Sequence, residues 1–441
     1  MTESRIATKG SALRSPTLHA FAALVFFTLL AGDVFRYSVS WYGWGAIALA
    51  QIAFCVVLLV RQRATWRIST LPYPLLAFLL LAILSLTWSQ YRLGTFLGIL
   101  TTIGTIIAGL TLAAIYTRDE LLRALGVALR LILGLSLAFE LFVSLVVRAP
   151  VLPLWVSYPQ YAEGEIPKLL FWSRNELLEG GKIQGIVGNS SLLGFVALLA
   201  VIVFAIQFAA HSVSRRWSGF WLVLAVVTVY LTRSATITVA LAALAITVLA
   251  VLILRTLTTS RARSLFYTGM VAIGVAAVFA VIAFSSTLLA ALGKSDDLTG
   301  RTGIWEAVIE FGSHQPVFGS GWISYWIPWM PPFDTLASAA GVQQLHAHNA
   351  WLDVWMQLGY VGLTVFLLLV LGTLVRTWSL AVDRPQFGAG QPGRFSATTL
   401  LPLLVMVALI VQSLAESRLL IEYGLMFLVL WAVSTKRDTV A

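Results

Sequence analysis

Long hydrophobic runs separated by shorter polar segments dominate the pattern of this 441-residue chain. A helix needs about 20 predominantly apolar residues to cross a bilayer. Each run that approaches this length predicts a spanning helix: 18–34, 44–60, 71–88, 94–116, 124–147, 190–210, 219–233, 235–254, 265–290, 350–375, 396–415 and 419–435. The pattern therefore predicts an all-α polytopic membrane protein with about 12 transmembrane helices.

Basic residues are concentrated in short polar segments, such as RQRATWR at 61–67 and RTLTTSRARS at 255–264. Cytoplasmic loops of membrane proteins carry an excess of Lys and Arg, so we assign these segments and both termini to the cytoplasm. The remaining long segments, 148–189 and 291–349, then lie outside. We predict a single transmembrane domain over 1–441, with these segments as its first and second long outer loops.

Composition agrees with a membrane protein. Hydrophobic residues make up 59% of the chain, charged residues only 11%, and the mean hydropathy is +0.89. The net charge of +10 would suit nucleic acid, but basic cytoplasmic loops explain it, and we do not expect a nucleic-acid partner. Cys55 is the single cysteine, so no internal disulfide can form.

The sequence HAHNAW, directly before the run 350–375, contains two of the five histidines. Asn349 is a favourable N-cap, and the helix dipole disfavours the protonated form of His348 beside it. A neutral imidazole can accept a proton near neutral pH. His346 would point in a different direction from His348 if both were helical. A zinc site needs a third ligand that the sequence does not identify, so no metal is predicted. Alternatively, the two histidines are polar residues at the membrane interface without a catalytic role.

Two arginines lie on the same predicted side as these histidines. Arg233 is at the outer end of the run 219–233, and Arg301 opens the segment RTGIWEAVIEF. A guanidinium matches the oxygens of an anionic group, and a diphosphate is the natural candidate. Alternatively, each arginine extends to the interface or forms a structural ion pair.

Aromatic residues are frequent in the second long outer loop. RTGIWEAVIEF has apolar residues at helical spacing, which predicts an amphipathic helix lying on the membrane surface. GWISYWIPWMPPF then brings Trp322 and Trp326 close together. These residues suit a stacking surface for sugar rings or a lip for a lipid-linked substrate, and the alternative is an interfacial aromatic belt.

Several motifs resemble the O-antigen ligase and polysaccharide polymerase family of bacterial membrane proteins. HNAWLDVWMQLGYVGL is similar to the family pattern at His348, Asn349, Leu352, Gly359 and Gly362. GRTGIWEAVIEFGSHQPVFGSGW is similar to the succession at Arg301, Trp305, Pro316, Gly319 and Gly321. LTRSA resembles the hydroxyl-and-arginine element at Thr232 and Arg233, and GIVGNSSLLG loosely resembles an element at Gly185, Gly188 and Asn189.

The resemblance implies a membrane glycosyltransferase of the GT-C type (GT-C_B-like). Such enzymes take a glycan from a polyprenyl (undecaprenyl) diphosphate carrier on the outer face of the bacterial cytoplasmic membrane. They join it to a sugar hydroxyl, without metal or other cofactor and with inversion. The acceptor is a lipid-anchored core of lipopolysaccharide or a growing surface polysaccharide or exopolysaccharide, and the sequence leaves ligase and polymerase both open.

The resemblance also implies roles for residues. His348 is expected to orient or deprotonate the acceptor hydroxyl, and Arg301 and Arg233 to stabilise the leaving diphosphate. The expected substrate-binding residues are His346, Asn349, Trp305, Asn189, Trp322 and Trp326.

Two other functions compete with this interpretation. A polytopic transporter or flippase would normally show two related halves, whereas these halves differ. A metal-assisted glycosyltransferase would use carboxylates such as Asp33, in the short outer segment GDVFRYSVSWYG, or the adjacent Asp296 and Asp297. Charged residues within the spans are expected to be structural or to line the substrate path: Arg130, Glu140 and Glu422.

Overall fold

The structure is a computed structural model that describes residues 16–61, 70–159, 161, 166–283, 301–339, 341–383, 386–387, 391–392 and 395–440. Asp296, Asp297 and the end of the predicted helix 265–290 lie outside the described residues.

Each of the twelve hydrophobic runs coincides with a helix in the described residues. These helices are α1 (Pro16–Leu30), α2 (Gly32–Arg61), α3 (Tyr73–Leu84), α4 (Arg92–Ile115), α5 (Arg118–Phe142), α6 (Ser190–Ala209), α7 (Arg215–Thr232), α8 (Ala235–Thr256), α9 (Ser260–Ala283), α12 (Ala350–Val382), α13 (Leu400–Ser413) and α14 (Glu422–Val440). Six of the described helices are long and apolar enough to cross a membrane: α2, α4, α5 with its extension to Val147, α6, α8 and α12. The helical membrane fold is confirmed, and crossing by all twelve stays a prediction.

Short elements connect these helices. The second long outer loop contains α11 (Arg301–Ser313) and a hairpin of β1 (Ser338–Ala339) and β2 (Val342–Gln343). A second antiparallel pair, β3 (Gln386–Phe387) and β4 (Gln391–Pro392), follows α12. The remaining elements are 3-10 or π turns: η5 (Ser85–Thr87), η6 (Val143–Val147), η7 (Lys168–Leu170), η8 (Gly185–Val187), η10 (Ala397–Thr399) and η11 (Ser417–Leu420).

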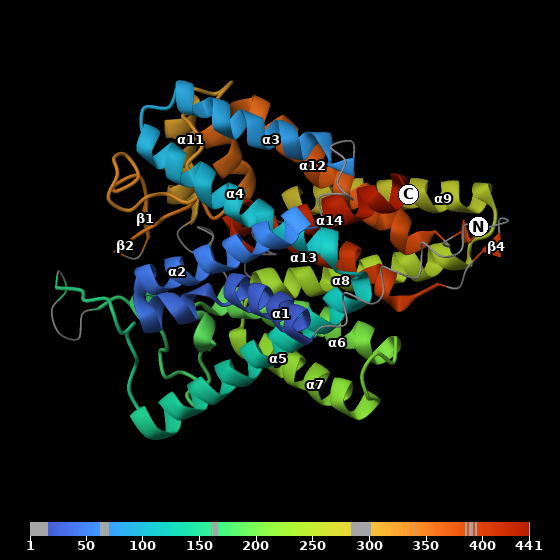
Figure 1. Ribbon diagram of the computed structural model, residues 1–441, viewed down its shortest axis with the longest axis horizontal. Helices are drawn as coiled ribbons and strands as arrows, with labels where there is room; N and C mark the ends of the chain where they lie inside the picture. The colour runs from blue at the N-terminus through green and yellow to red at the C-terminus, as the bar shows by residue number, and fades with distance from the viewer. Residues whose placement is uncertain are drawn as a thin grey trace.

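Two helical groups pack around a central pair of helices (Figure 1). Helices α3, α4, α11 and α12 form the upper group in this view, α5, α6 and α7 form the lower group, and α13 and α14 lie between them. The stretch 425–433 of α14 is buried on every side, because it packs against α4, α12 and α13. An apolar helix buried all round is typical of the centre of a helical bundle.

A break in α12 gives the second long outer loop its attachment. Gly359 has a φ of 63°, and the next two backbone N–H groups donate to the carbonyls of Pro316 and Val317. A Cβ atom at Gly359 would overlap the backbone of Val317. Glycine is needed here because it alone adopts this φ freely and lets the two backbones meet.

The loop helix α11 packs against protein. Its Ile304 and Val308 are buried in a cluster with Trp326 and Phe333, and the helix contacts α12. The predicted helix is confirmed. Its Ile304 and Val308 are covered by side chains of the second long outer loop and of α12, so this part of the apolar face does not lie on a membrane surface as expected, whereas Ile309 is 48% exposed.

The predicted stacking tryptophans are core residues. Trp322 and Trp326 are both 0% exposed. Their indole N–H groups donate to Thr102 Oγ1 and Asp353 Oδ1, each at 2.9 Å. Because neither ring reaches the surface in this structure, Trp322 and Trp326 hold the second long outer loop in place and do not form the expected stacking surface.

Two of the intramembrane charges have partners on neighbouring segments. Arg130 donates to Gln207 Oε1 at 2.5 Å and lies over the Phe204 ring. Glu140 accepts from Ser173 Oγ at 2.9 Å and from the backbone N–H groups of Gln184 and Gly185. Glu140 therefore ties the first long outer loop to α5, which is the structural role expected for a buried charge.

Candidate active site

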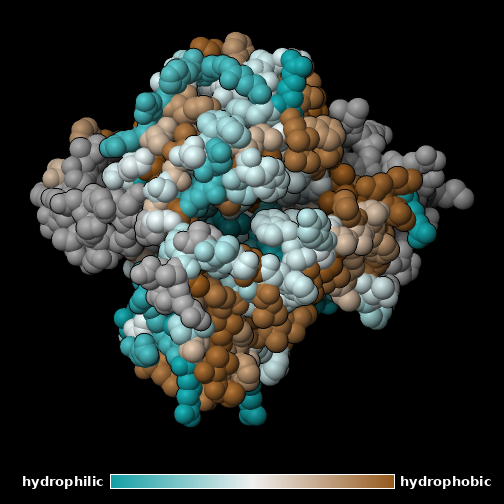
Figure 2. Space-filling model, turned by 90° about the vertical axis from the view of Figure 1, so that its left-hand side faces the viewer, coloured by the Kyte–Doolittle hydropathy of each residue, from teal (hydrophilic) through white to brown (hydrophobic). Residues whose placement is uncertain are grey.

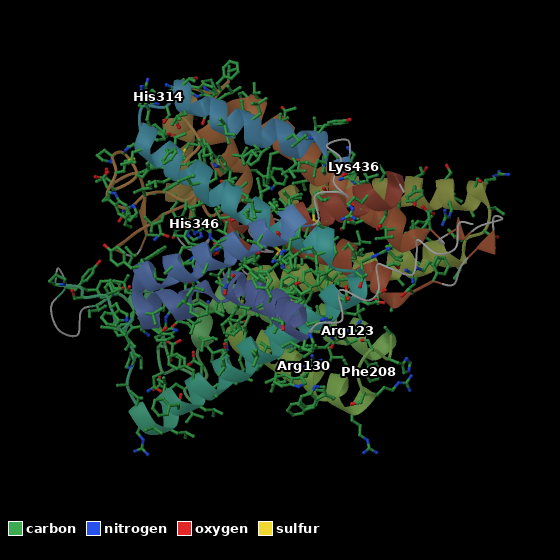
Figure 3. All side chains as sticks on the ribbon, in the orientation of Figure 1. Arg123, Arg130, Phe208, His314, His346 and Lys436 are labelled. Carbon is green, nitrogen blue, oxygen red and sulfur yellow. The ribbon has the colours of Figure 1, made fainter. Side chains whose placement is uncertain are left out.

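The predicted site residue His346 and two basic residues of predicted cytoplasmic segments lie apart along the length of the molecule. His346 lies toward the left of Figure 3, while Arg123 and Lys436, from predicted cytoplasmic segments, lie further to the right. Figure 2 looks onto the left-hand end, where a hollow with hydrophilic residues at its base opens near the middle of the face. Which side of the membrane each end faces stays a prediction.

The histidines lie in a tight turn before α12. Asn349 caps this helix, since its side-chain oxygen accepts from the N–H groups of Trp351 and Leu352 at 3.0 and 3.2 Å, as predicted. His348 has a φ of 50°, a conformation that non-glycine residues rarely adopt and that often occurs at functional sites. Its N–H donates to His346 Nδ1 at 3.1 Å, and the two rings are 4.0 Å apart. Neither histidine is helical, so the rings meet.

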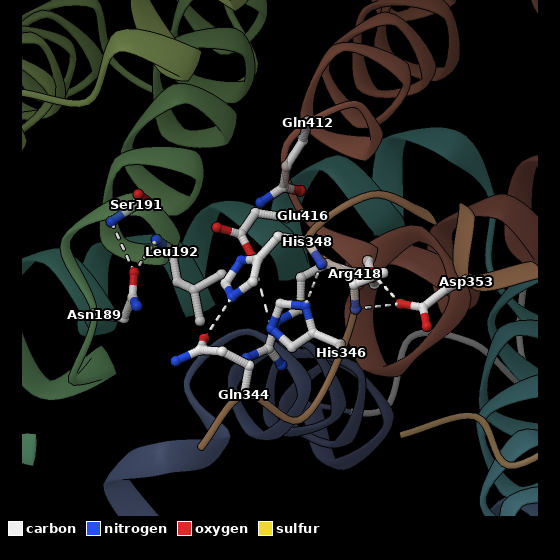
Figure 4. A network of polar contacts seen from close by, with 12 residues as sticks. Asn189, Ser191, Leu192, Gln344, His346, His348, Asp353, Gln412, Glu416 and Arg418 are labelled. Atoms are coloured by element: carbon white, nitrogen blue, oxygen red, sulfur yellow. Dashed lines mark hydrogen bonds and ion pairs between the residues drawn. The ribbon is translucent and has the colours of Figure 1, made fainter. Parts of the chain in front are cut away.

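Glu416, between α13 and α14, joins the predicted residues into one cluster (Figure 4). Arg301 Nη2 donates to Glu416 Oε1 at 3.1 Å. Oε2 faces His348 Nδ1 at 3.2 Å and His346 Nε2 at 3.8 Å. Only 6% of Glu416 is exposed. A carboxylate thus connects α11, the histidine turn and the C-terminal part of the chain.

Opposite charge keeps this carboxylate ionised. Burial alone would raise the pKa of Glu416, but the two imidazoles and the Arg301 guanidinium outweigh burial and lower it to about 2. Burial, followed by the charge of His348, holds the pKa of His346 well below its usual value. Near neutral pH the site therefore contains an ionised Glu416 and a neutral His346.

His348 has an oxygen at each ring nitrogen. Its Nε2 lies 2.9 Å from Gln344 Oε1, and the amide nitrogen of Gln344 donates to the carbonyl of Val342. Nδ1 faces Glu416. Because both neighbours are acceptors, the protonated ring satisfies both contacts in this arrangement. The sequence predicted a neutral ring, and that form requires a hydrogen-bond donor in the place of Gln344 Oε1.

His346, His348 and Glu416 offer three possible metal-ligand atoms within 4.8 Å of one another. Glu416 is thus the third ligand type that the sequence did not identify. However, His346 Nδ1 accepts a hydrogen bond, so in the neutral ring the proton is on Nε2, the nitrogen that faces Glu416. Arg301 already balances the carboxylate charge. These hydrogen bonds fit a proton-bearing site better than a metal site.

A second charged cluster is adjacent in sequence. Glu422 accepts from both Arg36 and Arg418, and Arg36 also donates to Asp33 at 2.7 Å. Arg418 is two residues after Glu416 and is 9% exposed. Asp33 is therefore held by a cation, which makes it a weak candidate for the rival carboxylate site, and Glu422 bridges α2 to the start of α14.

The other predicted residues have supporting or separate positions. Trp305 Nε1 donates to the carbonyl of Ala347, between the two histidines, at 3.0 Å. Asn189 caps α6 through the N–H groups of Ser191 and Leu192. Arg233 is exposed at the end of α7, and no ion pair joins it to another of the described residues. The structure thus brings His346, His348 and Arg301 together and leaves Arg233 outside their contacts.

Part of this chain is similar to known proteins. Residues 220–367, about a third of the chain, match a family model described as O-antigen ligase. This part of the chain is therefore similar to the O-antigen ligase family. It is also 32% identical over 203 residues to the exopolysaccharide production protein ExoQ of Rhizobium meliloti (strain 1021). That similarity covers 43% of this chain and 45% of ExoQ, so the chain matches less than half of the relative's length. The family region contains His346, His348 and Arg301, whereas Glu416 lies beyond it.

Proposed function

We propose that this protein is a glycosyltransferase that moves a glycan from a polyprenyl diphosphate carrier to a sugar hydroxyl. The observation that carries the proposal is the contact of one buried carboxylate, Glu416, with both His348 and Arg301. A base held by a carboxylate, beside a guanidinium, is suited to transfer in which one group loses a proton and another gains negative charge.

His348 is the proposed base. When the acceptor hydroxyl replaces Gln344 at Nε2, Nδ1–H still donates to Glu416, and Nε2 is free to accept the hydroxyl proton. The acceptor oxygen then bonds to the anomeric carbon as the bond from that carbon to the diphosphate oxygen breaks. Glu416 holds the ring in the required tautomer and stabilises the imidazolium that forms.

The leaving diphosphate carries the negative charge that develops. Partly buried Arg301 and buried Arg418 are cations whose charges act on His346, and we assign them to this negative charge. Arg233 is exposed beside Gly180 of the first long outer loop, where it would meet the diphosphate or its sugar only after the donor enters. The histidine turn is supported by His346, Trp305 and Asn349. Asn189 caps α6.

We infer that the reaction is metal-independent, inverts the anomeric carbon and occurs on the outer face of the bacterial cytoplasmic membrane. The fixed tautomer of His346 supports metal independence. Direct displacement of the diphosphate by the acceptor hydroxyl inverts the anomeric carbon. The basic residues at the opposite end support the orientation, with both termini in the cytoplasm and a GT-C type architecture. The acceptor, a lipid-anchored core or a growing polysaccharide, separates ligase from polymerase.

The test is glycan transfer by protein purified in lipid, with undecaprenyl diphosphate oligosaccharides as donors and either lipid-anchored core or donor glycan as acceptor. We expect His348→Ala and Glu416→Gln to lose transfer, because each removes one half of the proposed base. The matched control is Glu310→Gln, which removes an exposed carboxylate from α11.

Transfer by wild type and control, but by neither site variant, supports the proposal. Undiminished transfer by both site variants contradicts it. If wild type moves no donor to any acceptor but carries a lipid-linked glycan across a vesicle membrane, a flippase is the better assignment.

A further inference from the structure

We propose that Asp353 is a positioning residue that sets the distance between His348 and Glu416. This inference rests on the proposed function, because it concerns how the two halves of the proposed base are held. Asp353 is on the first turn of α12, is 0% exposed, and touches neither imidazole in the contacts of the described residues.

The two carboxylate oxygens of Asp353 reach different segments. Oδ1 accepts from Trp326 Nε1 at 2.9 Å, in the second long outer loop. Oδ2 accepts from the backbone N–H of Ala347 at 3.0 Å and from the hydroxyl of Ser417. Figure 4 shows Asp353 beside the histidine turn, with dashed lines that run from its carboxylate toward this turn.

The positions of these donors explain the inference. Ala347 lies between His346 and His348, and Ser417 directly follows Glu416. One oxygen therefore links the backbone of the histidine turn to the Ser417 side chain of the Glu416 segment. His348 and Glu416 are 68 residues apart in the sequence, so local sequence cannot set the distance between their side chains.

Charge makes this clamp strong. Hydrogen bonds to an ionised acceptor are about twice as strong as neutral ones, and a buried carboxylate needs several donors. Asp353 has donors from Trp326, Ala347, Ser417 and, at 3.4 Å, Gln357. Ser417 has no other side-chain hydrogen bond among the described contacts, so its hydroxyl is dedicated to the clamp.

The decisive variant is Ser417→Ala, which removes one hydroxyl and no charge. Its matched control is Ser413→Ala, which removes another buried hydroxyl, bonded to Trp351 Nε1 and the carbonyl of Ile410. We expect Ser417→Ala to lower kcat about 10-fold, since a shift of about 1 Å can cost about 100-fold. The donor KM and the thermal midpoint should stay close to those of Ser413→Ala.

A second readout needs no substrate. In protein labelled with 15N-histidine, Ser417→Ala should shift the imidazole signals of His346 and His348, and Ser413→Ala should leave them in place. Asp353→Asn should shift the same two signals further, because it removes the charge that all donors share.

A Ser417→Ala protein with unchanged kcat and unchanged histidine signals overturns the positioning role. Equal losses in both serine variants also overturn it, since the effect would then be general to this part of the fold. If wild type transfers no glycan, the proposed function fails, while a histidine shift confined to Ser417→Ala still supports the clamp.

Discussion

Replacement of Glu416 by glutamine tests the charge balance at the centre of the site. Glu416→Gln keeps the shape of the side chain and removes its charge, which leaves Arg301 and the imidazoles without their shared carboxylate. Breaking a buried ion pair on one side costs about 3–5 kcal/mol.

The pKa of Glu416 gives an independent magnitude. The pKa falls from 4.5 to about 2 on folding, and each pKa unit corresponds to about 1.4 kcal/mol, so ionised Glu416 contributes about 3 kcal/mol near neutral pH. Because the folded pKa is depressed, this contribution is complete above pH 4.5 and is lost as pH falls toward 2. At pH 3 about 1 kcal/mol should remain.

The assay is unfolding of wild type and Glu416→Gln in lipid nanodiscs, followed by tryptophan fluorescence at several pH values between 7 and 3. We expect the variant to be less stable by about 3 kcal/mol at pH 7 and the difference to shrink below pH 4.5. Glu310→Gln controls for loss of an exposed carboxylate. A difference that is absent at pH 7, or that stays constant down to pH 3, would refute the proposed charge balance.

Three further predictions concern the metal, the break in α12 and the second charged cluster. Glycan transfer should be unchanged by a chelator, because His346 holds a proton on the nitrogen that a metal would need; loss of transfer restored by added Zn²⁺ would contradict this. Gly359→Ala should abolish folding or lower stability by about 3 kcal/mol or more, since its Cβ overlaps Val317 at a left-handed φ, whereas Gly274→Ala, with open space around it, should fold normally in the same thermal assay. Glu422→Gln should cost about 3–5 kcal/mol of stability because it leaves two buried guanidiniums facing each other, and a thermal midpoint equal to that of the exposed Glu179→Gln would count against the ion bridge.

The hydrophobic pattern predicted the helices well because each needs only a local run of apolar residues. The same local signals identified Asn349 as the cap of α12 and the α11 helix. They misplaced Trp322 and Trp326, because aromatic spacing is the same for an interfacial belt and for a buried core. Segments distant in sequence decide which faces of a loop are covered. Here α12, with its break at Gly359, covers part of the second long outer loop.

Glu416 shows the corresponding limit for the site. Residues 416–418 form an all-polar turn, Glu-Ser-Arg, between two hydrophobic runs on the predicted outer side, and that was the available signal. Nothing in the turn itself indicates that its three side chains contact three different partners. Only the tertiary structure brings Glu416 to His348, Ser417 to Asp353 and Arg418 to Glu422.

The family region and the functional unit therefore have different boundaries. Residues 220–367 contain the histidines and Arg301, which are the proposed base and cation. The carboxylate that contacts the proposed base lies at 416, and the proposed clamp joins Asp353, inside the region, to Ser417, outside it. A side chain at 416 without an acceptor oxygen would leave His348 Nδ1 unpaired, whichever other motif residues are present. Under the proposed function, Glu416 is thus the residue whose identity decides whether His348 can act as a base.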